Sequence, residues 1–200
     1  PEFAMAAASP GNLFKFHGAE GGIHVTMIMS GPNLPQNIRQ DALVQVTDIA
    51  PTFLEMAGVE SETAGAVAMT GRSLMPLFTG ETEAVYGPDD PVAIEVSGNS
   101  ALIRDNYKIT RNQRPWGDAK WRLYDLANDP GEVNDLAAER PELMASMLAA
   151  YDAYGSAVGV LDVPEGYDSH AIITRKTQMR QLRIYWWVPA LLFLMLIAAF

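Results

Sequence analysis

A lysine and a histidine precede a glycine pair near the start of the chain. Lys15 and His17 come shortly before Gly21 and Gly22, and the apolar run 23–29 follows. A lysine ammonium is a compact charge with three donors, which suits negative charge developing on the oxygens of a reacting ester. A histidine beside it could contact the same substrate. On residue types alone, a lysine between two phenylalanines is more often a surface residue with a packed stem and a solvated head.

Four acidic residues lie close together later in the chain: Asp125, Asp129, Glu132 and Asp135. Their spacing is not that of a calcium-binding loop, and Asp-Pro-Gly is an ordinary turn sequence. We therefore expect a turn and a solvated face here, and no metal ligands in this chain.

Other polar residues are weaker candidates. Arg111, Arg114 and Trp116 are expected in a loop between strands, where they could border a substrate. His24 is expected in a buried strand as a hydrogen-bonded structural histidine.

Composition limits the class of protein. The chain has 200 residues, 48% hydrophobic and 19% charged, which favours one packed core, or a smaller core with an appendage. A formal charge of -10, without a basic stretch carrying interleaved aromatics in the part before the tail, excludes nucleic acid as a partner. The absence of cysteine excludes disulfides, thiolate zinc sites and a cysteine nucleophile within this chain.

The first half of the chain predicts α/β structure. Residues 23–29 are predicted to form a strand buried on both faces, as in a parallel sheet. A helix should begin at Thr47 or Asp48 and end at Gly58, with Ile49, Phe53 and Met56 packed on that sheet. Residues 59–91 predict a surface connection that contains one short helix within 71–80.

The second half predicts a different arrangement. Three β-rich stretches, 91–98, 100–110 and 120–129, indicate a small antiparallel meander with a hairpin at residues 104–106. A helix should start at Pro141 and end at Gly155, and its apolar stripe should cover one face of the meander. That stripe consists of Leu143, Met147, Tyr151 and Tyr154.

The last segment changes character. Four cations, Arg175, Lys176, Arg180 and Arg183, precede an uncharged run that begins at Ile184 and contains two tryptophans. This pattern is typical of membrane entry, although residues 185–200 would span only roughly 24 Å of the about 30 Å hydrocarbon layer. We expect membrane association through this segment, with the side of the membrane undecided; the alternative is an apolar helix docked on the protein.

Several motifs together resemble the type I sulfatases, particularly the bacterial arylsulfatases. Lys15 with "GGI" after five residues matches the family's K-x5-G-G-I signature, and "VTDIAPTFLEMAGV", "GRSLMPLFTGE" and "NYKIT" followed by "WRLYDLANDPGEVNDLA" continue the likeness in order. His24 and Thr26 stand where the family has arginine and proline. Residues 11 to about 160 are covered, and the tail is not.

The resemblance implies a fold and a division of the chain. Residues 1–90 would be the C-terminal part of an alkaline-phosphatase-like α/β sulfatase core, and residues 91–164 a small antiparallel subdomain with a packed helix. The resemblance does not reach residues 165–200; their own pattern predicts a basic linker and a transmembrane segment.

The resemblance also implies sulfate monoester hydrolysis, with Lys15 catalytic. His17 is a candidate for binding the substrate because it lies close to Lys15 in the sequence. A formylglycine nucleophile and Ca²⁺ would be supplied by residues outside this chain, in the missing N-terminal part of the same protein. The chain alone would then be inactive. Two alternatives remain open: a related phosphatase or phosphonate hydrolase, and a non-catalytic, membrane-anchored degenerate sulfatase module.

Overall fold

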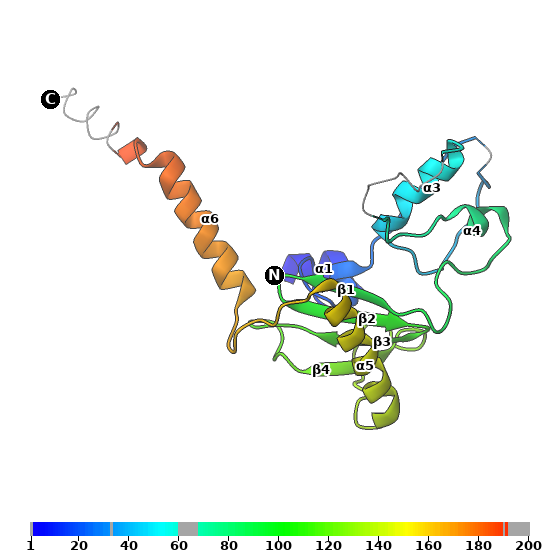
Figure 1. The fold of residues 1–200 in the computed structure, drawn as a ribbon. Coiled ribbons are helices and arrows are strands. Elements are labelled where there is room, and N and C mark those ends of the chain that lie inside the picture. The colour runs from blue at the N-terminus through cyan, green and yellow to red at the C-terminus, as the bar shows by residue number, and fades with distance from the viewer. Residues whose placement is uncertain (1, 33, 60–67, 190, 192–200) are drawn as a thin grey trace.

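The protein is represented by a computed structural model that describes residues 2–32, 34–59, 68–189 and 191. The sheet has four strands. Figure 1 shows α5 (Pro141–Val158) packed on one face of it and α6 (Ser169–Tyr185) extending away from this body. Helices α3 (Ile49–Met56) and α4 (Met75–Thr79) lie together on the side of the molecule away from α6.

The sheet is an antiparallel meander. Its strands are β1 (Val92–Val96), β2 (Asn99–Arg104), β3 (Tyr107–Arg111) and β4 (Trp121–Asp125), in the order β1-β2-β3-β4. Arg104 pairs with Tyr107 across a two-residue turn in which Asp105 has a φ of 53°. The predicted meander and its hairpin are therefore confirmed.

Helix α5 (Pro141–Val158) covers one face of this sheet. Leu102, Ile109 and Leu123 from three strands form the buried core with Met147 and Tyr151. The predicted apolar stripe is confirmed, because Leu143 and Tyr154 also pack against this core. The predicted end at Gly155 is wrong. The helix continues to Val158, and Gly159 ends it in the left-handed conformation that helix C-termini favour, with a φ of 74°.

The N-terminal region contains helix α1 (Glu2–Ala8) and the single-turn helix α2 (Glu20–Ile23). The predicted buried strand at 23–29 is wrong. Ile23 closes α2, residues 24–30 are in no helix or strand, and Val25 and Ile28 are 80% and 89% exposed. The sequence pattern identified this apolar segment correctly. Among the described residues, however, no strand lies beside it with which it could pair.

The helices of the middle region follow their local signals. The 3-10 turn η1 (Val46–Asp48) leads into α3 (Ile49–Met56), Gly58 follows with a φ of 67°, and α4 spans Met75–Thr79. The predicted buried face of α3 is wrong, because Phe53 is 55% exposed while Pro51 and Thr52 are buried. Helix α3 packs on α4 instead. Residues 60–67 of the predicted connection lie outside the described residues.

Helix α6 (Ser169–Tyr185) forms the basic segment. The side chain of Asp168 caps it by accepting a hydrogen bond from the Ala171 N–H at 2.8 Å. Most of the apolar run that follows, residue 190 and residues 192–200, lies outside the described residues. Within 2–32, 34–59, 68–189 and 191, no helix has both the length and the apolar character that a membrane crossing requires.

Candidate active site

Lys15 lies on a tightly folded loop, residues 11–19, that leads into α2. Leu13 and Phe16 have φ values of 58° and 80°, a left-handed conformation that side chains other than glycine rarely adopt. The glycine pair lets this loop fold back on itself. A Cβ on Gly21 would lie 2.3 Å from the Leu13 carbonyl oxygen, and a Cβ on Gly22 would lie 2.3 Å from that of His17. The sequence pattern that places two glycines after Lys15 is thus a packing requirement of the loop.

The side chain of Lys15 is exposed. Its Nζ lies 5.2 Å from the centroid of the Phe16 ring. Within the described part of the chain, no hydrogen bond or ion pair of the Lys15 ammonium is formed. Its charge is therefore available to a bound anion.

His17 is buried beside Lys15. Its Nδ1 donates to the Phe14 carbonyl oxygen at 2.8 Å, and because a carbonyl oxygen only accepts, Nδ1 carries the proton in this bond. The ring meets Phe14 and Trp116 edge to face, with centroids 4.8 and 5.5 Å away. Trp116 in turn contacts His170 of α6 at 5.0 Å. The structure therefore places Trp116 against the loop that carries Lys15, a contact that the sequence did not predict.

Two asparagines in or next to the sheet form hydrogen bonds with the backbone of this loop. Asn99 Nδ2 donates to the Phe16 carbonyl oxygen at 2.5 Å, and the Gly18 N–H donates to Asn112 Oδ1 at 2.9 Å. Asn99 is the first residue of β2, and Asn112 directly follows β3. The small sheet therefore fixes the backbone on the C-terminal side of Lys15.

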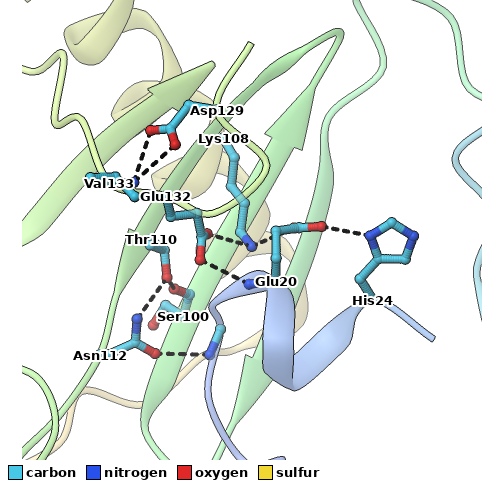
Figure 2. A network of polar contacts seen from close by, with 10 residues as sticks. Glu20, His24, Ser100, Lys108, Thr110, Asn112, Asp129, Glu132 and Val133 are labelled. Carbon is cyan, nitrogen blue, oxygen red and sulfur yellow. Dashed lines mark hydrogen bonds and ion pairs between the residues drawn. The ribbon is translucent and has the colours of Figure 1, made fainter. Parts of the chain in front are cut away.

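A buried charge cluster holds the end of the loop (Figure 2). Lys108 of β3 is fully buried, and its Nζ lies 2.7 Å from Glu20 Oε1 and 2.9 Å from Glu132 Oε1. Glu132 Oε2 also accepts the Glu20 N–H at 2.9 Å. Burial raises the pKa of Glu132, and the charge of Lys108 opposes that rise. Removing Lys108 would leave two buried carboxylates without their cation, at a cost of about 3–5 kcal/mol.

The prediction that Asp125, Asp129, Glu132 and Asp135 form a turn and a solvated face is partly wrong. Glu132 is buried in the Lys108 cluster, with a φ of 55°. Asp129 does form the expected turn, since its carboxylate accepts the N–H groups of Val133 and Asn134 at 2.8 Å each.

The remaining sequence candidates lie elsewhere. Arg111 packs on the α5 side of the sheet, over the Trp121 ring at 5.0 Å, so it does not reach the loop. Arg114 is exposed and bridges to Asp168 through the backbone. His24 does donate from Nδ1 to Glu20 Oε2 at 3.0 Å, but its side chain is exposed, so the predicted burial is wrong.

Sequence reasoning missed Glu20 and Lys108. Alternation places Lys108 on the face opposite to Tyr107 and Ile109, which pack toward α5, and a lysine on that face is predicted to be solvated. Glu20 gave no signal either, since Lys108 and Glu132 lie 88 and 112 residues away from it.

The resemblance to the sulfatases implies a calcium ion and a formylglycine. In the described residues, no group of three or more His, Cys, Asp or Glu side chains could hold a metal ion. The described side chains therefore do not fit the calcium site that the resemblance implies, and no stretch of the sequence matches the C/S-x-P-x-R motif in which the family's formylglycine forms.

Comparison with known proteins gives the family. Residues 15–150 match the family described as N-sulphoglucosamine sulphohydrolase, C-terminal. An uncharacterised sulfatase of Schizosaccharomyces pombe is 30% identical over 173 residues, which cover 84% of this chain and 31% of that protein. Arylsulfatase K of Xenopus laevis is 25% identical over 145 residues, covering 68% of this chain and 26% of that protein.

A solved structure supports the fold. The crystal structure of Ps i-CgsB matches with a TM-score of 0.50 and 23% identity over 62% of this chain and 26% of that one. The chain spans between a quarter and a third of the length of its curated relatives. The expected fold class is confirmed by this likeness and by the small antiparallel sheet with its helix, and the hydrophobic tail is not shown. The chain belongs to the sulfatases, and it matches the C-terminal portion of that family.

Proposed function

We propose that the protein containing this chain hydrolyses sulfate monoesters and that Lys15 supplies positive charge to the sulfate group. The observation that carries the proposal is the family match, which begins at Lys15 itself and runs through the sheet that holds its loop. Because the chain covers only part of its relatives, the reaction belongs to a longer protein, and residues 1–200 alone should be inactive. The relative named Arylsulfatase K supports an arylsulfatase-like substrate.

The chemistry of the ester requires such a cation. During hydrolysis, negative charge grows on the sulfonyl oxygens and on the leaving oxygen, and a fixed ammonium stabilises that charge more than it stabilises the substrate. Lys15 is exposed on a loop whose backbone is held by the sheet, so its charge is presented in a defined direction. His17 is the second candidate, since its Nδ1 is engaged by Phe14 and only Nε2 remains for a substrate.

Formylglycine and Ca²⁺ would supply the nucleophile and the sulfate-holding metal in the family. The described residues do not fit either group, so both would come from another part of the same protein. The role assigned to Lys15 does not depend on their geometry.

The test compares lysine variants in the complete protein. Lys15→Ala should lower kcat/KM for an aryl sulfate ester by about 10²- to 10³-fold with little change in Tm, as expected for loss of one oxyanion donor. Lys15→Arg should recover little, because a planar fork does not replace a point charge. Lys120→Ala, which removes another exposed lysine, should leave kcat/KM unchanged. Retention of more than about a third of the activity by Lys15→Ala would contradict the proposal.

The same preparation should distinguish sulfate from phosphate chemistry. A higher kcat/KM for a phosphate monoester than for the matching sulfate ester would identify a phosphatase instead. No turnover of either ester would favour a non-catalytic module.

Membrane association through residues 165–200 is a further part of the proposal. Helix α6 carries Arg175, Lys176, Arg180 and Arg183 and has no acidic residue. Leu182 near its end and Trp186 directly after it are exposed. Cations beside aromatic residues suit the surface of an anionic bilayer. The complete protein should sediment with membranes after a carbonate wash, whereas a version ending at Tyr167 should not. Equal recovery of both versions in the supernatant would contradict this part.

A further inference from the structure

The loop of Lys15 is held in a conformation that its own sequence does not favour. Leu13 and Phe16 flank Lys15 with φ values of 58° and 80°, and neither is a glycine. Such residues keep this conformation only where surrounding contacts enforce it. The contacts that enforce it therefore fix the backbone that carries Lys15.

Those contacts come from the small sheet and its connections. Asn99 holds the carbonyl oxygen of Phe16, and it accepts the Gln113 N–H at 2.6 Å with its other amide atom. Asn112 holds the Gly18 N–H, and its own Nδ2 donates to Thr110 Oγ1 at 3.2 Å. Each asparagine side chain is thus held by one hydrogen bond near the sheet and makes another to the backbone of the loop.

The charge cluster completes the attachment. Lys108 points from β3 toward Glu20, and Glu132 reaches both the Lys108 ammonium and the Glu20 N–H, as Figure 2 shows. Glu20 is the first residue of α2, so this cluster fixes the point at which the loop becomes helix. Its members are separated by 88 and 112 residues in the chain, and they meet only when the sheet is folded.

We infer that Lys108, Glu132 and Asn112 are positioning residues that hold the Lys15 loop, and through it the charge that the reaction uses. The inference rests on the proposed function for Lys15. A purely structural cluster would stabilise the whole sheet, whereas a positioning cluster should act on the loop and on turnover while the rest of the sheet stays intact.

Hydrogen exchange on the full 200-residue chain tests the attachment without any activity. In Asn112→Ala the amides of residues 16–20 should exchange about tenfold faster, the effect of losing one hydrogen bond, while those of β2 and β3 should keep their rates. Asn112→Asp retains the acceptor oxygen and should restore slow exchange at Gly18. Asn128→Ala, in an exposed turn, is the matched control and should change nothing. Unchanged loop amides in Asn112→Ala, or equal acceleration across the sheet, would overturn the inference.

Lys108→Met extends the test to the charge cluster. In this variant the amides of residues 16–22 should also exchange faster than those of the sheet. If both variants only unfolded the whole sheet, with no selective effect on the loop, the inference would be overturned. Asn112→Ala keeps the test decisive if Lys108→Met does not fold.

A double-mutant cycle in the complete enzyme separates positioning from stability. Asn112→Ala should lower kcat for the sulfate ester about tenfold or more, and it should lower it little further once Lys15 is alanine, because both changes act through one ammonium. Fully additive losses would overturn the positioning role. If Lys15→Ala itself were fully active, the proposed function would fail, and the exchange data would still decide whether the sheet holds the loop.

Discussion

The carboxylate of Asp48 accepts a hydrogen bond from the backbone N–H of Arg72 at 2.8 Å. Asp48 belongs to the stretch "VTDIAPT" and Arg72 to the stretch "GRSL", two motifs that are 24 residues apart. The same carboxylate accepts the Gln45 N–H and the Tyr86 hydroxyl, both at 2.7 Å. These motifs occur together because one buried carboxylate joins the start of α3 to the loop that leads into α4.

Replacing this carboxylate should weaken the middle region strongly. Asp48→Ala leaves three donors without their acceptor, and each donor that stays buried costs about 1–3 kcal/mol. The urea midpoint of the chain, followed by circular dichroism, should therefore fall clearly. Asp41→Ala, at an exposed position paired only with Arg39, should shift the free energy of unfolding by less than about 0.5 kcal/mol. Similar midpoints for the two variants would show that Asp48 is not a structural hub.

Gly21→Ala should distort the Lys15 loop. The added Cβ would meet the carbonyl oxygens of Asn12 and Leu13 at 2.5 and 2.3 Å, and backbone atoms cannot move aside as a flexible side chain can. Overpacking of this kind costs about 1–3 kcal/mol.

A second glycine offers the control for Gly21→Ala. A Cβ on Gly31 would meet only Leu34 Cδ1 at 3.6 Å, so Gly31→Ala should be neutral. Thermal unfolding of both variants gives the comparison. Equal Tm values would mean that the loop is not packed as described.

The hydroxyl of Tyr86 predicts a pH dependence at high pH. Burial, and then the hydrogen bond to Asp48, raise the pKa of Tyr86 to about 12 in the folded chain. The unfolded chain has a tyrosine pKa of about 10. The unfolded state therefore loses its proton first, and the free energy of unfolding falls as pH rises from 10 to 12.

Tyr86→Phe isolates this contribution. At pH 8 it should cost about 1 kcal/mol, the value of one hydrogen bond. The difference from the unmodified chain should narrow between pH 10 and 12, because the phenylalanine has no proton to lose. Urea midpoints at pH 8, 10 and 11.5 give the measurement. A gap that stays constant over this range would contradict the raised pKa.

Local signals predicted the elements that depend on local chemistry. The turn at residues 104–106, the short helix α4 and the helix that begins at Pro141 follow from turn residues, capping and period, and the structure contains all three. We predicted that α5 ends at Gly155, but the helix continues through this glycine and Gly159 caps it. A helix interior tolerates a glycine at a modest cost, whereas the left-handed cap position favours one.

Contacts across the chain could not be predicted in this way. The partners of Lys108 depend on the return of residues 11–24 onto the sheet, and no local pattern specifies that return. Lys15 could be singled out only by its resemblance to a signature. Residue types alone favoured a surface lysine, and its exposed side chain is consistent with either interpretation.

The exposed segment 24–28 provides the last prediction, which concerns the rest of the protein. Val25 and Ile28 are apolar, yet they are 80% and 89% exposed, and their burial was expected from the sequence. If the complete protein is a longer sulfatase, its preceding part should cover this segment. The double change Val25→Ser and Ile28→Ser should then have different effects in the two contexts. In the 200-residue chain it should change the free energy of unfolding by less than about 0.5 kcal/mol, because both side chains already contact water. In the complete protein it should cost about 1.5–3 kcal/mol for each buried side chain. Equal and small effects in both would show that this face stays exposed, and equal and large effects would show that the chain buries the segment by itself.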